Sequence, residues 1–86
     1  MKVVVVHWLD TLSDRAQVSL KQALGMKPVP IVSSGILVRD DDEGIVLSQD
    51  ILHFDDDDIA YRDTEMIPKA YITSIEIKDF NGHSND

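Results

Sequence analysis

Two runs of apolar, β-branched residues, separated by charged residues, form the strongest pattern in the chain. The runs are residues 31–38 and 45–49, and the segment between them reads Arg-Asp-Asp-Asp-Glu-Gly. This segment is too acidic to be buried, and its last residue, Gly44, can adopt a positive φ. The pattern predicts a β-hairpin with a turn of about four to six residues.

Alternating apolar positions predict further strands on both sides of this hairpin. Residues 2–8 form a first strand with apolar side chains on both faces, so that residues 3–6 suit a buried edge. Residues 50–54 extend the second arm of the hairpin. Short strands follow at residues 59–62 and 71–78, with a turn at residues 63–65. Val4, Val6 and Trp8 lie on one face of the first strand, and Val3, Val5 and His7 lie on the other.

Residues 13–25 predict one short helix after the first strand. Ser13 suits the N-cap, Asp14 the first turn and Gly25 the C-terminal end. A helix of about three turns would place a modest apolar face over one opening of a small barrel. A loop with a single helical turn is the alternative. The apolar face would consist of Ala16, Leu20, Ala23 and Leu24.

Two further residues predict local backbone features. Gly35 lies inside the first arm of the hairpin, where a glycine marks a bulge or a close approach of another backbone segment. Pro68 presets φ for a helical turn immediately after an extended residue. Residues 81–86 contain no apolar side chain and are expected to be disordered.

The segment around Pro68 also carries a resemblance to a known fold. Residues 66–75 read Met-Ile-Pro-Lys-Ala-Tyr-Ile-Thr-Ser-Ile. This pattern resembles the strand, 3₁₀ turn and strand that end SH3-like barrels. No Ala-Leu-Tyr-Asp-Tyr segment occurs, so the resemblance does not imply binding of Pro-rich peptides. We predict a mainly β fold: one SH3-like or Sm-like barrel of about five strands over residues 1–80, with one short α-helix after the first strand.

Most of the chain is also similar to a group of small uncharacterised proteins carried by phages and prophages. Three blocks carry this resemblance: residues 4–10 with Trp-x-Asp, residues 33–48 with Ser-x-Gly and the acidic turn, and residues 66–77 with Ile-Pro. Ile36 departs from the aromatic residue expected after the glycine. None of the blocks is a catalytic motif. The resemblance implies a protein that acts in the cytoplasm of a bacterial host.

Charge is distributed unevenly along the chain, whose formal net charge is −8. Residues 1–38 hold four basic and two acidic side chains, giving +2, and residues 39–86 hold four basic and fourteen acidic ones, giving −10. Such a second half repels polyanions, so direct nucleic-acid binding is not expected. The acidic excess serves either solubility or contact with a basic protein, including mimicry of nucleic acid. The short apolar run at the N-terminus predicts neither a signal peptide nor a membrane span.

The common chemical motifs do not fit this sequence. No register of the aspartate runs places glycine and glutamate where an EF-hand loop requires them. His7, His53 and His83 lack the spacing of a zinc site. The chain has no cysteine and only four scattered glycines, so thiol chemistry and a phosphate-binding loop are not indicated. We therefore expect no metal, no cofactor and no catalysis.

Six residues are candidates for contact with a ligand or partner. Trp8 either fills the core or lies half-exposed at a pocket or subunit interface, and Asp10 follows it on the same face. A base could stack on an exposed tyrosine, and nearby cations could hold a phosphate. The other four candidates are Arg39, Tyr61, Arg62 and Lys69.

The sequence leaves three functions open. The first is a non-catalytic binding or inhibitor protein, phage-encoded, that acts on a host protein such as a defence protein. The second is an oligomeric binder of a small anionic ligand, such as a nucleotide, held between subunits. The third is a structural phage component. Homo-oligomerisation through edge strands is expected in each case, because small β-sheets leave edges that pair readily.

Overall fold

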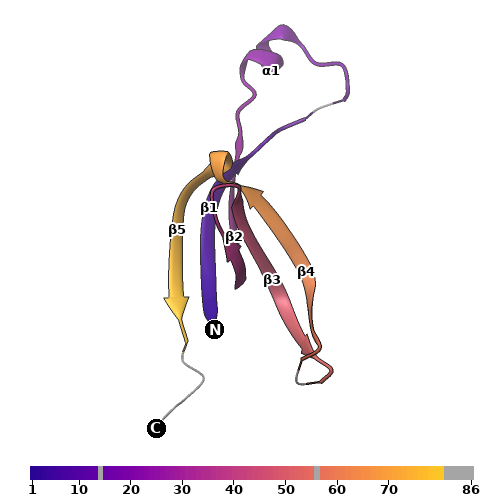
Figure 1. Cartoon of the computed structure of the whole chain (residues 1–86). Helices are drawn as coiled ribbons and strands as arrows, with labels where there is room; N and C mark the ends of the chain where they lie inside the picture. The colour runs from indigo at the N-terminus through magenta and orange to yellow at the C-terminus, as the bar shows by residue number, and fades with distance from the viewer. Residues whose placement is uncertain (14, 56, 81–86) are drawn as a thin grey trace.

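The computed structural model describes residues 1–13, 15–55 and 57–80 of the chain. Five strands form one antiparallel sheet in the order β4-β3-β2-β1-β5 (Figure 1). The prediction of a mainly β fold with very little helix is confirmed, whereas the tail predicted at residues 81–86 lies outside the described residues. The elements are β1 (Lys2–Asp10), α1 (Leu20–Leu24), β2 (Val29–Asp40), β3 (Gly44–His53), β4 (Ile59–Pro68), the 3₁₀ helix η1 (Lys69–Tyr71) and β5 (Ile72–Asp79).

Strand β1 lies inside the sheet rather than at its edge. It pairs with β2 on one side, with Val5 opposite Ser34, and with β5 on the other, with Val5 opposite Glu76. The prediction of a buried edge at residues 3–6 is therefore wrong. The apolar content of both faces reflects a central position, where backbone groups on both sides are paired. The ladders formed by the described residues leave β4 and β5 at the two edges.

The core is small and draws on three strands. Val4 and Val6 of β1 are fully buried, as the alternating pattern predicts, and Trp8 packs partly buried beside them. A register shift against β1 lies between His7 and Trp8, and it places Ile72 opposite Trp8. The alternation predicted from Tyr71 is therefore broken at the start of β5. The other buried apolar residues are Ile45, Leu47 and Ile67.

The hairpin of β2 and β3 forms as predicted, with a shorter turn. The strands extend to Asp40 and resume at Gly44, leaving three residues between them. Gly44 has a φ of +156°, and an added Cβ there would collide with the carbonyl of Ile67 on β4. Gly35 also meets a neighbouring backbone, since its Cβ would lie 2.7 Å from the carbonyl oxygen of Ser48. The predicted close approach is thus confirmed.

The 3₁₀ turn predicted after Pro68 is present as η1, and it forces the sheet to curl. It joins the two edge strands, because β4 ends at Pro68 and β5 begins at Ile72. Four residues span at most about 14 Å, whereas the edges of a flat five-stranded sheet lie about 19 Å apart. The edges must therefore approach each other at this end, where Figure 1 shows β4 and β5 meeting at η1.

The helix predicted from residue 13 is wrong over most of its length. Helix α1 starts at Leu20, and Ser19 is its N-cap. The Ser19 Oγ accepts from the Gln22 amide at 3.1 Å, and the Gln22 side chain accepts from the Ser19 amide at 2.9 Å. This reciprocal capping box defines the start more strongly than Ser13 can, and Asp14 lies outside the described residues. A loop with a single turn, the alternative from the sequence, is confirmed. No residue of α1 is buried, so it does not cover a barrel opening.

Strand β4 passes straight through the turn predicted at residues 63–65, so that prediction is wrong. Its register with β3 is the same before and after Asp63, which has a positive φ of 55°. The Ser48 hydroxyl donates to the carbonyl of Arg62 at 2.6 Å and bridges the strands beside this distortion. The positive φ is therefore absorbed within the ladder, and the chain does not reverse.

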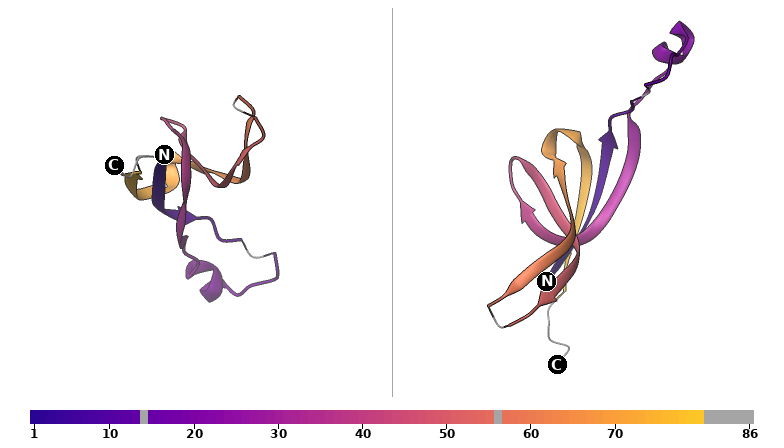
Figure 2. Two further views of the ribbon diagram at one scale, coloured as in Figure 1. Left: turned by 90° about the horizontal axis from the view of Figure 1, so that it is seen from below. Right: turned by 90° about the vertical axis from the view of Figure 1, so that its right-hand side faces the viewer.

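Two extensions of the sheet run in opposite directions from the core (Figure 2). Beyond Trp8 only β1 and β2 continue, and they lead into α1. Beyond Ser48, among the described residues, only β3 and β4 continue, from Asp50 to the connection after His53. The molecule is consequently elongated, with extents of 60 × 25 × 22 Å.

Replacement of Gly44 tests the contact between the turn and β4. We expect Gly44→Ala to lower the free energy of unfolding by about 1–3 kcal/mol, because the new Cβ meets the Ile67 carbonyl in a strained backbone conformation. Gly25→Ala is the matched control, since its φ is −90° and its Cβ would make ordinary contact with Lys21. Urea unfolding measures both variants. Equal stability of the two would contradict the packing described for Gly44.

Candidate functional site

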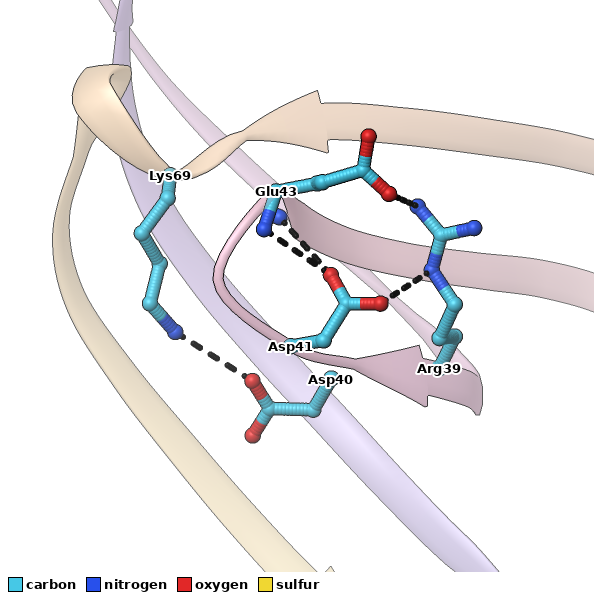
Figure 3. A network of polar contacts seen from close by, with 6 residues as sticks. Arg39, Asp40, Asp41, Glu43 and Lys69 are labelled. Atoms are coloured by element: carbon cyan, nitrogen blue, oxygen red, sulfur yellow. Dashed lines mark hydrogen bonds and ion pairs between the residues drawn. The ribbon is translucent and has the colours of Figure 1, made fainter.

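The acidic turn between β2 and β3 is organised by one carboxylate. Asp41 accepts from the backbone N–H groups of Glu43 at 2.9 Å and Gly44 at 3.3 Å (Figure 3). Its other oxygen lies 2.9 Å from Nε of Arg39, whose Nη2 is 3.7 Å from Glu43. An aspartate at this position satisfies amides that a tight turn leaves unpaired. The arrangement fixes the shape of the turn.

Lys69 joins this turn to η1. Its backbone N–H donates to the carbonyl of Glu43 at 2.9 Å, and its Nζ lies 3.2 Å from Oδ1 of Asp40 (Figure 3). The structure thus brings together two predicted site residues, Arg39 and Lys69, at the same turn. Both cations face carboxylates of the turn, so the cluster is internally compensated. It does not present positive charge to an anion.

Tyr61 and Arg62 lie on the part of β4 that continues beyond the core. Tyr61 pairs with Ile51 in the ladder and is exposed. Nε of Arg62 lies 3.0 Å from Oδ2 of Asp50 on the neighbouring strand. This cation is therefore also engaged by a carboxylate. An exposed pair of this kind contributes little to stability and leaves the tyrosine ring accessible.

Trp8 and Asp10 lie near the opposite extension. Trp8 is partly buried against the core, and its Nε1 donates to Oγ of Ser33 on β2 at 3.0 Å. Asp10 accepts from the amide of Thr11 at 2.8 Å at the end of β1. The indole thus combines core packing with a satisfied polar group, as aromatic residues at the margin of a core commonly do.

The six predicted site residues therefore fall at three separate places. These are the end of β1, the acidic turn with η1, and the outer part of β4. The three cations among them, Arg39, Arg62 and Lys69, each face a carboxylate of the same chain. A phosphate-binding cluster of these cations is not assembled within one chain. Over the described residues, no group of three or more metal-ligating side chains is present.

The end of the β3–β4 hairpin carries exposed apolar and acidic side chains side by side. Phe54 is 63% exposed and lines a shallow hollow together with Asp55, Asp57 and Asp58. The Phe54 amide donates to the carbonyl of Asp58 at 2.9 Å, which closes the connection. We call these four residues, with Ile59 and Tyr61, the hairpin tip.

Sequence reasoning did not single out Phe54 as a site residue. Its position at the end of an alternating strand suggested an ordinary strand residue. The available signal was the run of aspartates that follows it: these carboxylates must be solvated, so the strand has to end near Phe54, where fewer neighbours are present to cover the ring. The two acidic segments lie at opposite ends of β3, about 33 Å apart. An acidic face that includes both, as nucleic-acid mimicry would need, would have to extend along the whole length of β3.

Replacement of Asp41 tests its role in the acidic turn. We expect Asp41→Ala to lower the free energy of unfolding by about 1 kcal/mol, because two backbone amides lose their acceptor. Asp42→Ala removes the same charge from the same turn, and the Asp42 side chain makes no hydrogen bond or ion pair with the described residues. Its effect should be close to zero. Urea unfolding of both variants measures the difference, and equal losses would assign the effect to charge alone.

No helix in the described parts of the chain is long and apolar enough to cross a membrane. Comparison of the chain with protein-family models, with curated proteins and with solved structures gave no match. The resemblance to phage-encoded proteins therefore stays a prediction.

Proposed function

We propose that this chain is a non-catalytic binding protein that engages a basic protein partner through the hairpin tip. One observation carries this proposal: the side chain of Phe54, 63% exposed, stands among the carboxylates of Asp55, Asp57 and Asp58. An aromatic ring that is accessible to a partner can supply most of the binding energy of an interface. The surrounding carboxylates raise the rate of association with a positively charged protein surface, and they disfavour association with a negatively charged one.

The position of the hairpin tip favours contact with another protein. It lies beyond the core, on two strands that pair with no further strand in the described part of the chain. A protruding hairpin can enter a concave surface without rearrangement of the sheet. The same carboxylates disfavour a nucleic acid as the partner, because its phosphates would be repelled. A protein with basic residues around an apolar pocket matches both features of the tip.

The resemblance of the sequence to phage-encoded proteins supports a host protein as this partner. Binding alone would then inhibit the host protein by covering its basic surface. In a pull-down from bacterial extract at physiological salt, we expect the wild-type chain, and not Phe54→Ala, to retain a specific protein. Retention of no protein by the wild-type chain would count against a host partner.

The SH3-like or Sm-like barrel and the homo-oligomer belong to the same proposal. The strand order β4-β3-β2-β1-β5 and the turn η1 between the edge strands support a barrel of that kind. The edges of β4 and β5 support self-association, because unpaired strand edges add strands readily. For the alternative functions, an anionic-ligand binder and a structural phage component, the described residues of one chain offer no comparable feature.

A direct binding titration tests the hairpin tip. The probe is a synthetic peptide rich in lysine and leucine, and a peptide with glutamate in place of lysine serves as its counterpart. We expect the basic peptide to bind at least about tenfold more tightly than the acidic one. Phe54→Ala should weaken its binding by about tenfold. Fluorescence anisotropy of labelled peptides measures the affinities.

The matched control for this titration is Phe80→Ala. Phe80 is also exposed, and it follows β5 rather than the hairpin tip. Its replacement should leave the affinity unchanged. Equal affinity for the basic and the acidic peptide would contradict the proposal that the tip prefers a basic partner. Equal losses of affinity in Phe54→Ala and Phe80→Ala would show that Phe54 does not form the binding site.

A further inference from the structure

The connection between β1 and β2 is exposed over nearly all of its described length, with Val18 half-buried. We call its described residues, 11–13 and 15–28, the arm. None of them is buried. Its single helix has five residues, and Leu20 and Leu24 are 74% and 78% exposed. Helices shorter than about 12 residues are marginal in water without tertiary contacts. The arm therefore requires an apolar surface to pack against.

The hairpin tip has the same deficiency at the other end of the molecule. It continues a two-stranded ribbon, and two strands alone are marginally stable at best. Its exposed residues include Phe54, Ile59 and Tyr61. The arm and the tip lie at opposite ends of the molecule in Figure 1 and in the right-hand view of Figure 2, and the longest extent of the molecule is 60 Å. One chain cannot bring its own arm to its own tip.

Charge makes the two surfaces complementary. The connection, residues 11–28, carries three basic side chains, Arg15, Lys21 and Lys27, and one acidic side chain, Asp14, giving +2. The hairpin tip carries Asp55, Asp57 and Asp58 and no basic side chain. Contact between two arms, or between two tips, would bring like charges together. Contact between an arm and a tip pairs opposite charges around apolar side chains.

The accessible surface is large enough for such an interface. The chain exposes 6664 Å², whereas a compact monomer of its mass exposes about 5,100 Å². Its radius of gyration is 17.6 Å, compared with about 12 Å for a compact domain of this length. A standard interface covers about 800 Å² on each partner. The excess surface of one chain exceeds that value.

We propose that the arm of one copy packs against the hairpin tip of a second copy, in an antiparallel dimer with two equivalent contacts. The antiparallel arrangement leaves no arm or tip uncovered, because the twofold axis places each arm against the tip of the other copy. Leu20 and Leu24 then meet the apolar residues of the tip, and the lysines meet its aspartates.

The dimer also regulates the site, and this part of the proposal rests on the function proposed above. An arm that covers the hairpin tip competes with any basic partner for Phe54 and the aspartates. The tip becomes available when the dimer dissociates. The arm is thus a basic, apolar ligand for the tip that the protein itself supplies.

Charge reversal tests the arm-to-tip contact. The arm variant is Lys21→Glu with Lys27→Glu, and the tip variant is Asp57→Lys with Asp58→Lys. Native mass spectrometry should show the wild-type chain at twice its mass of 9.7 kDa. Each variant alone should dimerise at least about tenfold more weakly. The arm variant carries a net negative charge like the tip, and in the tip variant the two lysines cancel the charges of Asp55 and Asp56, so that the attraction for the arm is lost. An equimolar mixture of the two variants should restore a dimer of one copy of each.

Each alternative contact gives a different pattern in this experiment. A wild-type monomer overturns the proposal. A dimer that resists both reversals overturns it too, and points to pairing of the edges of β4 or β5. If the tip variant dimerises normally while the arm variant does not, two arms meet each other. Recovery of the mixed dimer is the result that only an arm-to-tip contact predicts.

A neutral arm variant separates this proposal from the proposed function. The double variant Leu20→Ser with Leu24→Ser leaves the charge of the arm unchanged and should weaken the dimer. Because the arm then no longer covers the tip, the affinity of the lysine–leucine peptide for the tip should rise by about tenfold. If the dimer dissociates and no variant binds the peptide, the proposed function fails and the dimer stands. If the peptide binds the tip with the same affinity in this variant and in the wild-type chain, the dimer fails and the function stands.

Discussion

A core of five buried apolar side chains stabilises only the middle of this chain. Val4 and Val6 from β1 pack with Ile45, Leu47 and Ile67 from the β3–β4 ladder. Everything beyond Trp8 in one direction, and beyond Ser48 in the other, consists of two strands and their connections. The burial of apolar surface is the main driving force of folding. The structure therefore contains a core-packed centre and two ends with few buried contacts, which is why we propose that a second copy packs against them.

The acidic turn shows how charge is accommodated close to this centre. Gly44 brings the turn against Ile67, and Lys69 and Arg39 lie beside its carboxylates. Carboxylates of the turn therefore form ion pairs with cations of the same chain. The hairpin tip, in contrast, presents carboxylates around an exposed phenylalanine without such cations. Two segments with nearly the same composition thus differ in role, because only one of them has basic neighbours in space.

Local signals allowed a large part of the fold to be predicted from the sequence. The β2–β3 hairpin, the close approach at Gly35 and the 3₁₀ turn after Pro68 each depend on a few neighbouring residues. Non-local features were missed. The central place of β1 depends on pairing with β5, which is about seventy residues away in the chain. The sequence of an apolar strand is also similar whether the strand lies in the centre or at an edge of a sheet.

The helix and the site show a second kind of limit. A capping box at Ser19 and Gln22 competes with the weaker signal at Ser13, and only the stronger one is used. The six predicted binding residues are all of types that commonly bind ligands. The sequence, however, does not show which carboxylate lies beside each cation in the folded chain. Arg62 and Asp50, for example, are paired across strands. The exposure of Phe54 likewise follows from its place just beyond the end of the ladder at His53; the aspartates after it mark that end in the sequence, but not how far the ring is covered.

Hydrogen exchange as a function of protein concentration tests most directly whether the two ends of the chain stabilise each other between copies. Amides of the arm, such as those of α1, and amides of the hairpin tip should gain protection together as the concentration rises. Amides of Val4 and Val6 in the core should remain protected throughout. Rapid exchange of the arm and the tip at every concentration would contradict stabilisation of the ends by a second copy. Protection of both at the lowest concentration would contradict it as well.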